Sequence, residues 1–342
     1  MDALINAGEL KRLGRCDPAQ TECRLGWAMS GVEFRARCTE VSVEMDCDYS
    51  EQCPWMSVLL DDAPVARFPL QRGRHRYLAL AGLDGDTARR IALVRDTQPI
   101  PGDERMRVEV QAVFLAGERL PDGPQRKIIE FAGDSLTSGE GTVGAVGEEQ
   151  WRMAFMSASH TYAQMLCEKL GAEGRWVSQS GWGVCRSWDG DESCRIPAVY
   201  DQVCATDPRG NADYDFAAHP ADVVIVNLGT NDSTPMAALR GRERKAYREA
   251  FEKGAEAFLR QIRSRYPRAQ ILWCYGMCEK RLWREIDAAA EALRADGDEQ
   301  VHALLLPACR QAEIGSRMHP GQASHRRAAE LIAQKLQSLG VC

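Results

Sequence analysis

Hydrophobic and polar residues alternate with a period of two along the first third of the chain. From about residue 26 to residue 120 the alternating stretches are "VEFRAR", "EVSVEM", "WMSVLLDDAPVARFPL", "HRYLALAGLDG", "RRIALV" and "RMRVEVQAVF". Turn signals such as "DDAP" and "LDGD" interrupt them. This pattern is typical of antiparallel strands that bury one face. It predicts an all-β sandwich of the jelly-roll type over residues 1–120.

The pattern changes after the segment "ERLPDGPQ". Short apolar runs, "KIIEFAG", "RWVSQS", "DVVIVNLG", "AQILWCYG" and "HALLLP", now alternate with segments of helical period. One helix is expected to stop near Gly171, another before Pro267, and the last to run from Pro320 to Gly340. Such runs are typical of parallel strands covered by helices on both faces, so residues 127–342 are predicted to form a three-layer α/β domain.

The chain length and composition agree with two soluble domains. The chain has 342 residues, whereas single cores stop growing at roughly 250 to 300. Its formal net charge of -6 argues against a nucleic-acid or anionic-membrane partner, because both need clustered Lys and Arg. No apolar run is long enough for a membrane span. The sequence leaves the oligomeric state open.

The amino terminus and the cysteines bear on the compartment. "MDALINAGELKRLGRC" has Asp2 where an export signal carries positive charge, which predicts a cytoplasmic protein, or a secreted one if a leader is missing. The 13 cysteines are scattered and form no CxxC pair. Free thiols in a reducing compartment are therefore preferred to a disulfide framework, and no metal site is predicted.

Four stretches could carry chemistry: "GDSLTSGEG" with Ser135, "QSGWG" with Gly181, "NLGTND" with Asn231 and "SRMHPGQASH" with His319. Each has an ordinary explanation alone, as a turn or a helix cap. Three follow predicted strands, and the fourth precedes the final helix. Because the carboxyl ends of parallel strands meet at one sheet edge, the four stretches together supply a nucleophile, oxyanion donors and a base.

This set and order resemble the SGNH or GDSL hydrolases, over roughly residue 127 to the carboxyl end. The resemblance implies a flavodoxin-like parallel sheet, Ser135 as nucleophile and His319 as general base and then acid. It also implies an oxyanion hole made by the Ser135 and Gly181 N–H groups and the Asn231 amide, with no metal or organic cofactor. The preceding sandwich, with the extended blocks "GDSLTSGEG" and "HPGQASH", looks like carbohydrate esterase family 2.

One position departs from the superfamily pattern. Most SGNH enzymes carry an Asp three residues before the His, whereas this chain has Ser316. Resemblance to family 2 implies a Ser–His dyad, and we hypothesise that a main-chain carbonyl near Ser316 or Arg317 accepts from the His319 Nδ1–H. Glu313, the nearest acid in sequence, is the rival for this place.

Several other residues have expected roles. Asp134 is expected to be structural, and His325 to pack or hydrogen-bond on the final helix, while His160 and His75 lie outside the four stretches. Trp151, Trp182 and Trp188 are candidate platforms for a sugar ring, with core packing as the alternative for each. Trp182, between two glycines, is preferred.

The resemblance to family 2 implies a serine esterase that removes O-acetyl groups from plant-type oligo- or polysaccharides such as xylan and mannan. A lipid or thioester hydrolase of the GDSL type is one alternative, and the polar insert "RSWDGDESCR" argues weakly against it. A carbohydrate-binding protein with an inactive hydrolase domain is another. The absence of a visible leader favours imported oligosaccharides as substrate. The sandwich either binds glycan itself or supports the second domain and its cleft.

Overall fold

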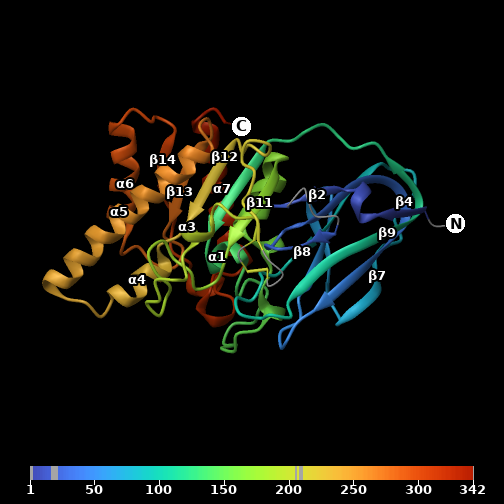
Figure 1. Cartoon of the computed structure of the whole chain (residues 1–342), viewed down its shortest axis with the longest axis horizontal. Coiled ribbons are helices and arrows are strands. Elements are labelled where there is room, and N and C mark those ends of the chain that lie inside the picture. The colour runs from blue at the N-terminus through green and yellow to red at the C-terminus, as the bar shows by residue number, and fades with distance from the viewer. Residues whose placement is uncertain (1–2, 17–21, 205, 208–210, 342) are drawn as a thin grey trace.

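The computed structural model describes residues 3–16, 22–204, 206–207 and 211–341. Its first part, the β-sandwich region, is antiparallel and lies on the right in Figure 1. Its strands are β1 (Ala3–Asn6), β2 (Lys11–Leu13), β3 (Cys23–Arg24), β4 (Gly31–Asp48), β5 (Trp55–Leu60), β6 (Ala63–Pro69), β7 (Gly73–Ala81), β8 (Arg89–Arg95) and β9 (Arg107–Leu120). A 3-10 turn, Ala7–Glu9, follows β1. The sequence analysis did not predict the short strands β1 to β3.

The long strand β4 organises this region. Its first residues pair with β2 and β8, its later residues pair with β7, and β9 runs beside it from Arg35 to Asp48. The strands enclose an apolar core to which β4, β5, β8 and β9 all contribute, including Val43, Val58 and Ile91. Alternate burial along these strands accounts for the period of two in the sequence.

The second part, the parallel-sheet region, is a five-stranded parallel sheet in the order β11-β10-β12-β13-β14. The strands are β10 (Ile128–Gly133), β11 (Glu173–Ser178), β12 (Val223–Asn227), β13 (Gln270–Tyr275) and β14 (Val301–Leu305). The helices are α1 (Ser135–Ser138), α2 (Tyr162–Leu170), α3 (Ile196–Val199), α4 (Thr230–Met236), α5 (Gly241–Arg265), α6 (Trp283–Ala295) and α7 (Gln322–Ser338). Four 3-10 turns complete the described part of this region: Met153–Phe155, Ala158–His160, Gln311–Glu313 and Ser316–Met318.

Helices cover both faces of this sheet, which confirms the predicted fold class of an antiparallel β region followed by an α/β domain. Helices α5 and α6 pack with Phe258 and Ile286 on one face. Helices α2 and α7 pack with Leu166 and Ile332 on the other face, where Leu59 of the β-sandwich region joins the same core. In Figure 1, α5 and α6 lie on the side away from the sandwich. The division into domains at residues 120 and 127 remains a proposal.

A fully buried ion pair joins the two regions at strand β10. Arg15, just after β2, lies 2.9 Å from Glu130 in the middle of β10, and neither side chain is exposed. The hydroxyls of Tyr200 and Tyr266 donate to the same carboxylate at 2.6 and 2.9 Å. Burial of a carboxylate is unfavourable unless it is paired and hydrogen-bonded, so these partners make Glu130 tolerable at this position.

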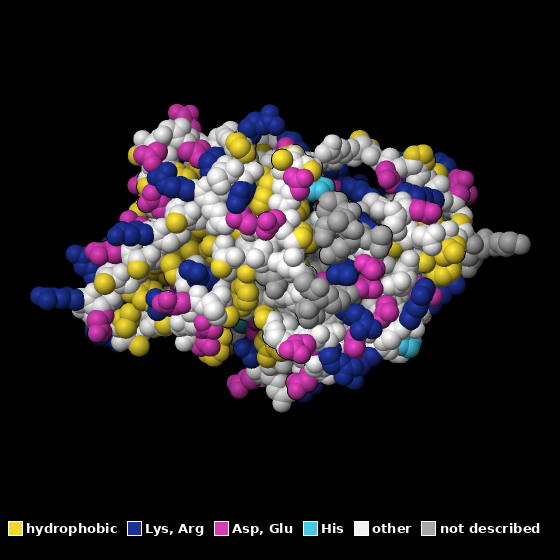
Figure 2. Space-filling view, viewed as in Figure 1, with side chains coloured by type: hydrophobic (Ala, Val, Ile, Leu, Met, Phe, Trp, Pro, Cys, Tyr) yellow, Lys and Arg dark blue, Asp and Glu magenta, His cyan; other side chains and the backbone are white. Residues whose placement is uncertain are grey.

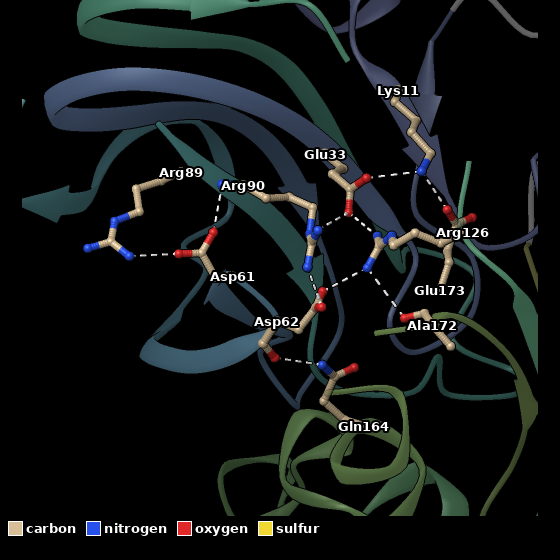
Figure 3. A network of polar contacts seen from close by, with 10 residues as sticks. All are labelled: Lys11, Glu33, Asp61, Asp62, Arg89, Arg90, Arg126, Gln164, Ala172 and Glu173. Atoms are coloured by element: carbon tan, nitrogen blue, oxygen red, sulfur yellow. Dashed lines mark hydrogen bonds and ion pairs between the residues drawn. The ribbon is translucent and has the colours of Figure 1, made fainter. Parts of the chain in front are cut away.

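A second polar network lies at the rim of the same interface, as Figure 3 shows. Arg126, in the segment between β9 and β10, contacts both Glu33 of β4 and Asp62 of the turn after β5, the latter at 2.8 Å. Its guanidinium also donates to the Ala172 carbonyl, just before β11, at 3.3 Å. One cation therefore connects three segments that are far apart in the sequence.

Two further contacts extend this network across the interface. Lys11 of β2 pairs with Glu33 at 3.0 Å and also with Glu173 at the start of β11. The Gln164 side chain, on α2, donates to the Asp62 carbonyl at 2.7 Å. The network therefore fixes the β-sandwich region against α2 and β11.

The surface carries charges of both signs. On the face seen in Figure 2, Lys and Arg side chains are interspersed with Asp and Glu. None of the described helices is long and apolar enough to cross a membrane. The twelve cysteines within the described residues are free.

Arg126→Met should destabilise the protein by about 2 kcal/mol, because it removes one partner of two largely buried carboxylates that Lys11 and Arg90 only partly compensate. Urea unfolding of the whole chain measures this change. Arg89→Met is the matched control: Arg89 and Asp61 form an exposed pair, which predicts a loss below about 0.5 kcal/mol. Equal losses for both variants would contradict a specific role of the buried network.

Candidate active site

Ser135 lies where the chain leaves the sheet. Strand β10 ends at Gly133, and α1 begins at Ser135. A Cβ atom at Gly133 would come within 2.0 Å of the Thr137 hydroxyl, so this position requires glycine. The Asp134 carboxylate accepts from the Leu136 N–H at 3.0 Å, which caps the turn, and burial raises the pKa of Asp134 to about 7. This local structure holds the Ser135 hydroxyl at the carboxyl edge of the sheet.

His319 contacts Ser135 directly. Its Nε2 lies 3.0 Å from the Ser135 Oγ, and its Nδ1 lies 2.9 Å from the carbonyl oxygen of Arg317. Because a carbonyl only accepts, Nδ1 carries the proton and Nε2 is free to accept one from the hydroxyl. The ring is thus oriented as the hypothesis of a main-chain acceptor requires, while the catalytic dyad itself stays a prediction.

The loop before His319 has an unusual backbone. Arg317 and Met318 both have positive φ, +52° and +58°, which is costly for residues with side chains. The Ser316 N–H donates to the Gly141 carbonyl at 3.1 Å. A Cβ atom at Gly141 would come within 2.8 Å of the His319 Cβ, so only glycine allows this close approach. The glycines after Ser135 therefore shape the loop that presents the Arg317 carbonyl.

Ser316 stands where most SGNH enzymes have the acid. Its side chain is fully buried. A Cβ atom at Gly144 would lie 2.2 Å from the Ser316 hydroxyl oxygen, so the Gly144 backbone packs closely against the Ser316 side chain. The space accepts a hydroxymethyl group but leaves little room for a carboxylate.

Glu313, the rival orienting acid, is engaged elsewhere. Its carboxylate accepts from the Ser324 hydroxyl at 3.1 Å and pairs with Arg327 at 2.9 Å, both on α7. Within the described part of the chain it has no contact with His319. The geometry therefore favours the main-chain carbonyl over Glu313.

The three predicted oxyanion donors surround the same opening. Ser135, Gly181 and Asn231 line a cleft of about 400 Å³ together with His319. Among the residues that the structure describes, the N–H groups of Ser135 and Gly181 donate to no other group. The Asn231 Nδ2 donates to the Trp182 carbonyl at 2.7 Å and to the Asp134 Oδ2 at 3.4 Å, so a bound oxygen would take over the hydrogen of the longer contact. The structure brings these predicted residues together, and their roles remain proposals.

The three tryptophans divide between cleft and core. Trp151 and Trp188 line the cleft, and Trp188 is 59% exposed. The Trp188 main-chain N–H donates to the Gly181 carbonyl at 3.0 Å, so Trp188 lies close to that glycine. Trp182 is not among the described residues that line the cleft; it packs against the core under α5 and α6. The structure thus places Trp151 and Trp188 in the cleft and Trp182 against the core, and the role of each as a sugar platform stays a prediction.

Asp232, in the third block, was overlooked by the sequence analysis. Its carboxylate accepts from the N–H groups of Val184 at 2.9 Å, Cys185 at 2.8 Å and Arg186 at 3.2 Å. Burial raises the pKa of Asp232. This carboxylate fixes the chain that follows the second block, and the Asp in "GTND" was the available signal.

Gln98 was also missed, and it comes from the segment after β8. Its side chain is 2% exposed, and its Oε1 accepts from the Ser180 N–H at 2.8 Å. Its carbonyl accepts from Arg95 at 3.2 Å. The β-sandwich region thus holds the peptide immediately before Gly181, a contact between residues 82 positions apart that no local pattern indicates.

His325, on α7, connects elements next to the site. It is fully buried, and its Nδ1 accepts from the Tyr162 N–H at the start of α2 at 3.1 Å. Its Nε2 lies 3.3 Å from the Thr142 hydroxyl. Burial, with a further effect of nearby His319, lowers the pKa of His325 to about 3. The ring therefore joins α7, α2 and the loop after Ser135 in its neutral form.

The remaining candidates lie away from the cleft. His75 is exposed, and His160 lies 2.8 Å from the Ser157 hydroxyl. Over the described ranges no group of three or more His, Cys, Asp or Glu side chains could hold a metal ion.

The model of the GDSL-like Lipase/Acylhydrolase family matches residues 131–327, a segment that contains Ser135, Gly181, Asn231 and His319. The chain belongs to this family. The match covers more than half of the chain and begins inside β10.

Individual relatives of the chain are esterases by name. The chain is 25% identical over 336 residues to "Cellulase/esterase CelE" of Acetivibrio thermocellus, covering 94% of this chain but only 38% of that protein. An acetyl xylan esterase, Est2A, from the rumen bacterium Butyrivibrio proteoclasticus superposes with a TM-score of 0.92 at 29% identity, over 99% of both chains. A family two carbohydrate esterase from Clostridium thermocellum, in complex with cellohexaose, superposes at 0.83 with 22% identity over 99% of this chain and 100% of that one. The last likeness shows the shared fold.

Gln98→Ala should lower kcat for 4-nitrophenyl acetate about 10-fold with little change in KM, because the Ser180–Gly181 peptide loses the acceptor that orients it. Steady-state kinetics measure the effect. Gln111→Ala, in β9, is the matched control and should behave as wild type. A wild-type kcat for Gln98→Ala would show that the peptide holds its position without this contact.

His325 should make stability depend on pH in the acid range. Because its pKa is lower in the folded state than the ordinary 6.5, the unfolded state binds the proton first as the pH falls, so stability decreases from about pH 6.5 toward about 3. We expect wild type to lose about 2 kcal/mol between about pH 6.5 and 5 through this residue.

Urea unfolding at the two pH values measures this loss. His325→Asn removes the titrating ring while its Oδ1 can still accept from the Tyr162 N–H, and so this variant should lack the loss due to His325. His75→Asn, at the exposed histidine, should lose as much stability as wild type. Identical pH slopes for wild type and His325→Asn would contradict the expectation.

Proposed function

We propose that this chain is a serine esterase that removes O-acetyl groups from plant-type oligo- or polysaccharides, with acetylated xylan as the preferred class. The observation that carries the proposal is the contact of 3.0 Å between the His319 Nε2 and the Ser135 Oγ beside an open cleft. The likeness to an acetyl xylan esterase over nearly the whole chain supports the substrate class.

The geometry fits acyl transfer through an acyl-enzyme. The Ser135 Oγ attacks the acetyl carbonyl carbon while the His319 Nε2 takes the hydroxyl proton. The N–H groups of Ser135 and Gly181 and the Asn231 amide receive the oxyanion, and one such donor can lower the barrier by about 3 kcal/mol. His319 then protonates the departing sugar oxygen. Water, deprotonated by the same nitrogen, attacks the acetyl-serine and releases acetate.

The cleft favours a sugar over a long acyl chain. Trp151 and Trp188 supply aromatic faces on which the apolar side of a sugar ring can lie. The other lining residues, apart from Gly181, are polar or charged, among them Glu140, Thr234 and Arg317. A lipid or thioester hydrolase would need an apolar groove for its acyl chain, and so we place these activities second. The assembled Ser135–His319 pair argues against an inactive, purely glycan-binding protein.

Wild type should release acetate from acetylated xylo-oligosaccharides, and Ser135→Ala should lower this activity at least 10³-fold, because the acyl-enzyme cannot form. An enzymatic acetate assay measures the release, with acetylated manno-oligosaccharides, 4-nitrophenyl acetate and 4-nitrophenyl octanoate in parallel. Ser264→Ala, at an exposed position on α5, is the matched control.

Each pattern of turnover has one interpretation. Release from manno-oligosaccharides alone would keep the deacetylase and change the glycan. Turnover of octanoate without release from either glycan would indicate a lipid or thioester hydrolase. No turnover of any substrate by wild type would indicate a carbohydrate-binding protein with an inactive hydrolase domain.

A further inference from the structure

The proposed dyad leaves a charge without an evident partner. When His319 takes the proton of Ser135, its ring becomes a cation. The Arg317 carbonyl contributes only a partial charge, and the Asp that stabilises this cation in most SGNH enzymes is replaced by Ser316. A carboxylate elsewhere in the cleft could supply the missing charge.

Glu140 is such a carboxylate. Its Oε2 lies 3.9 Å from the His319 Nε2, the nitrogen that receives the proton, and its side chain is only 8% exposed. It lines the same cleft as Ser135. At this separation and burial, attraction between unit charges is much stronger than between exposed groups.

The position of Glu140 is fixed relative to the nucleophile. The N–H groups of Gly139 and Glu140 both donate to the Ser135 carbonyl, at 2.9 and 3.0 Å. Gly139 has φ of +82°, and a Cβ there would come within 2.1 Å of the Ser157 carbonyl oxygen, so the turn requires glycine. Backbone bonds therefore hold the carboxylate beside the serine.

Arg317 holds the carboxylate from the other side. Its Nε donates to the Glu140 Oε1 at 2.8 Å, while its own carbonyl accepts from His319. Glu140, Arg317 and His319 thus form one connected unit in which the Glu140 Oε2 faces the imidazole.

We propose that Glu140 is the electrostatic partner of His319 and stabilises the imidazolium that forms during acyl transfer. The proposal rests on the proposed esterase function. Orientation and charge, which one Asp provides in most of the superfamily, are divided here between the Arg317 carbonyl and the Glu140 carboxylate.

Other charged groups near Glu140 and His319 determine how strongly Glu140 stabilises the imidazolium. The Arg317 guanidinium opposes this stabilisation, because it neutralises part of the Glu140 charge. Asp134 lies close enough for the charge of Glu140 to affect it, and His325 senses His319. Because Arg317 opposes the carboxylate, we expect a loss of about 10-fold on removing the Glu140 charge, far below the roughly 10⁴-fold loss when a triad acid is neutralised.

The first test follows the His319 ring directly and needs no turnover. NMR of histidine-labelled protein gives the midpoint of each ring titration, and the spectrum of His319→Ala identifies the relevant signal. In Glu140→Gln, which keeps the acceptor for Arg317, the His319 midpoint should move to lower pH, because the protonated ring loses its anion. Glu149→Gln, exposed on the following segment, should leave the midpoint unchanged.

The opposite charge change provides a second, independent variant. Arg317→Gln keeps the main-chain carbonyl and removes the opposing cation, so the midpoint should move to higher pH. If Glu140→Gln does not fold, this variant decides the question. An unchanged midpoint in either folded variant would overturn the proposal.

Kinetics then connect the charge to the reaction. With 4-nitrophenyl acetate, kcat of Glu140→Gln should fall about 10-fold with KM unchanged, and the acidic limb of the pH profile should move to lower pH. Glu140→Asp, which keeps the negative charge, should restore part of kcat and part of the position of the acidic limb. A purely structural role would lower stability without moving the acidic limb. Failure of the esterase function would appear separately, as turnover that survives Ser135→Ala, and the NMR result would still decide the role of Glu140.

Discussion

The buried ion pair between Arg15 and Glu130 is the contact on which the site geometry depends. Glu130 lies inside a strand whose two neighbours and two helix layers exclude water, so its charge requires a buried cation. That cation comes from the β-sandwich region, where Arg15 also lies over the rings of Tyr200 and Tyr214, at 4.8 and 4.5 Å from their centroids. Strand β10 leads directly to Ser135, and so the same pair couples the nucleophile to the sandwich.

The two regions consequently behave as parts of one site. The Arg126 network fixes the outer rim of the interface, and Gln98 reaches the peptide before Gly181. Leu59 of the sandwich shares a core with α2 and α7. The sandwich was expected either to bind glycan or to support the second domain and its cleft. These contacts favour the supporting role. Residues outside the segment that the family match covers therefore contact the proposed site, and we expect its chemistry to depend on them.

Sequence patterns predicted the repetitive parts of this structure well. The period of two and the buried apolar runs located β4 to β14, whereas β1, β2 and β3, with two to four residues each, are too short to display a period. The meeting of Ser135 and His319 followed from the four ordered blocks. Glu140 and Gln98 could not be assigned, because their contacts join segments 177 and 82 positions apart and leave no local pattern. The sequence could not show that Trp182 packs against the core, because side-chain direction in a turn has no periodicity.

The positive φ angles of Arg317 and Met318 have a consequence for how such sites are recognised. The group that orients the imidazole is a peptide carbonyl, which every residue possesses, and its direction is encoded by main-chain torsion. Nothing in the one-letter code at position 317 therefore marks it as part of the proposed dyad. A search for an acid three residues before the histidine would find none in this chain. The direction of the Arg317 carbonyl is set instead by the main-chain torsion angles and by the glycines that permit them.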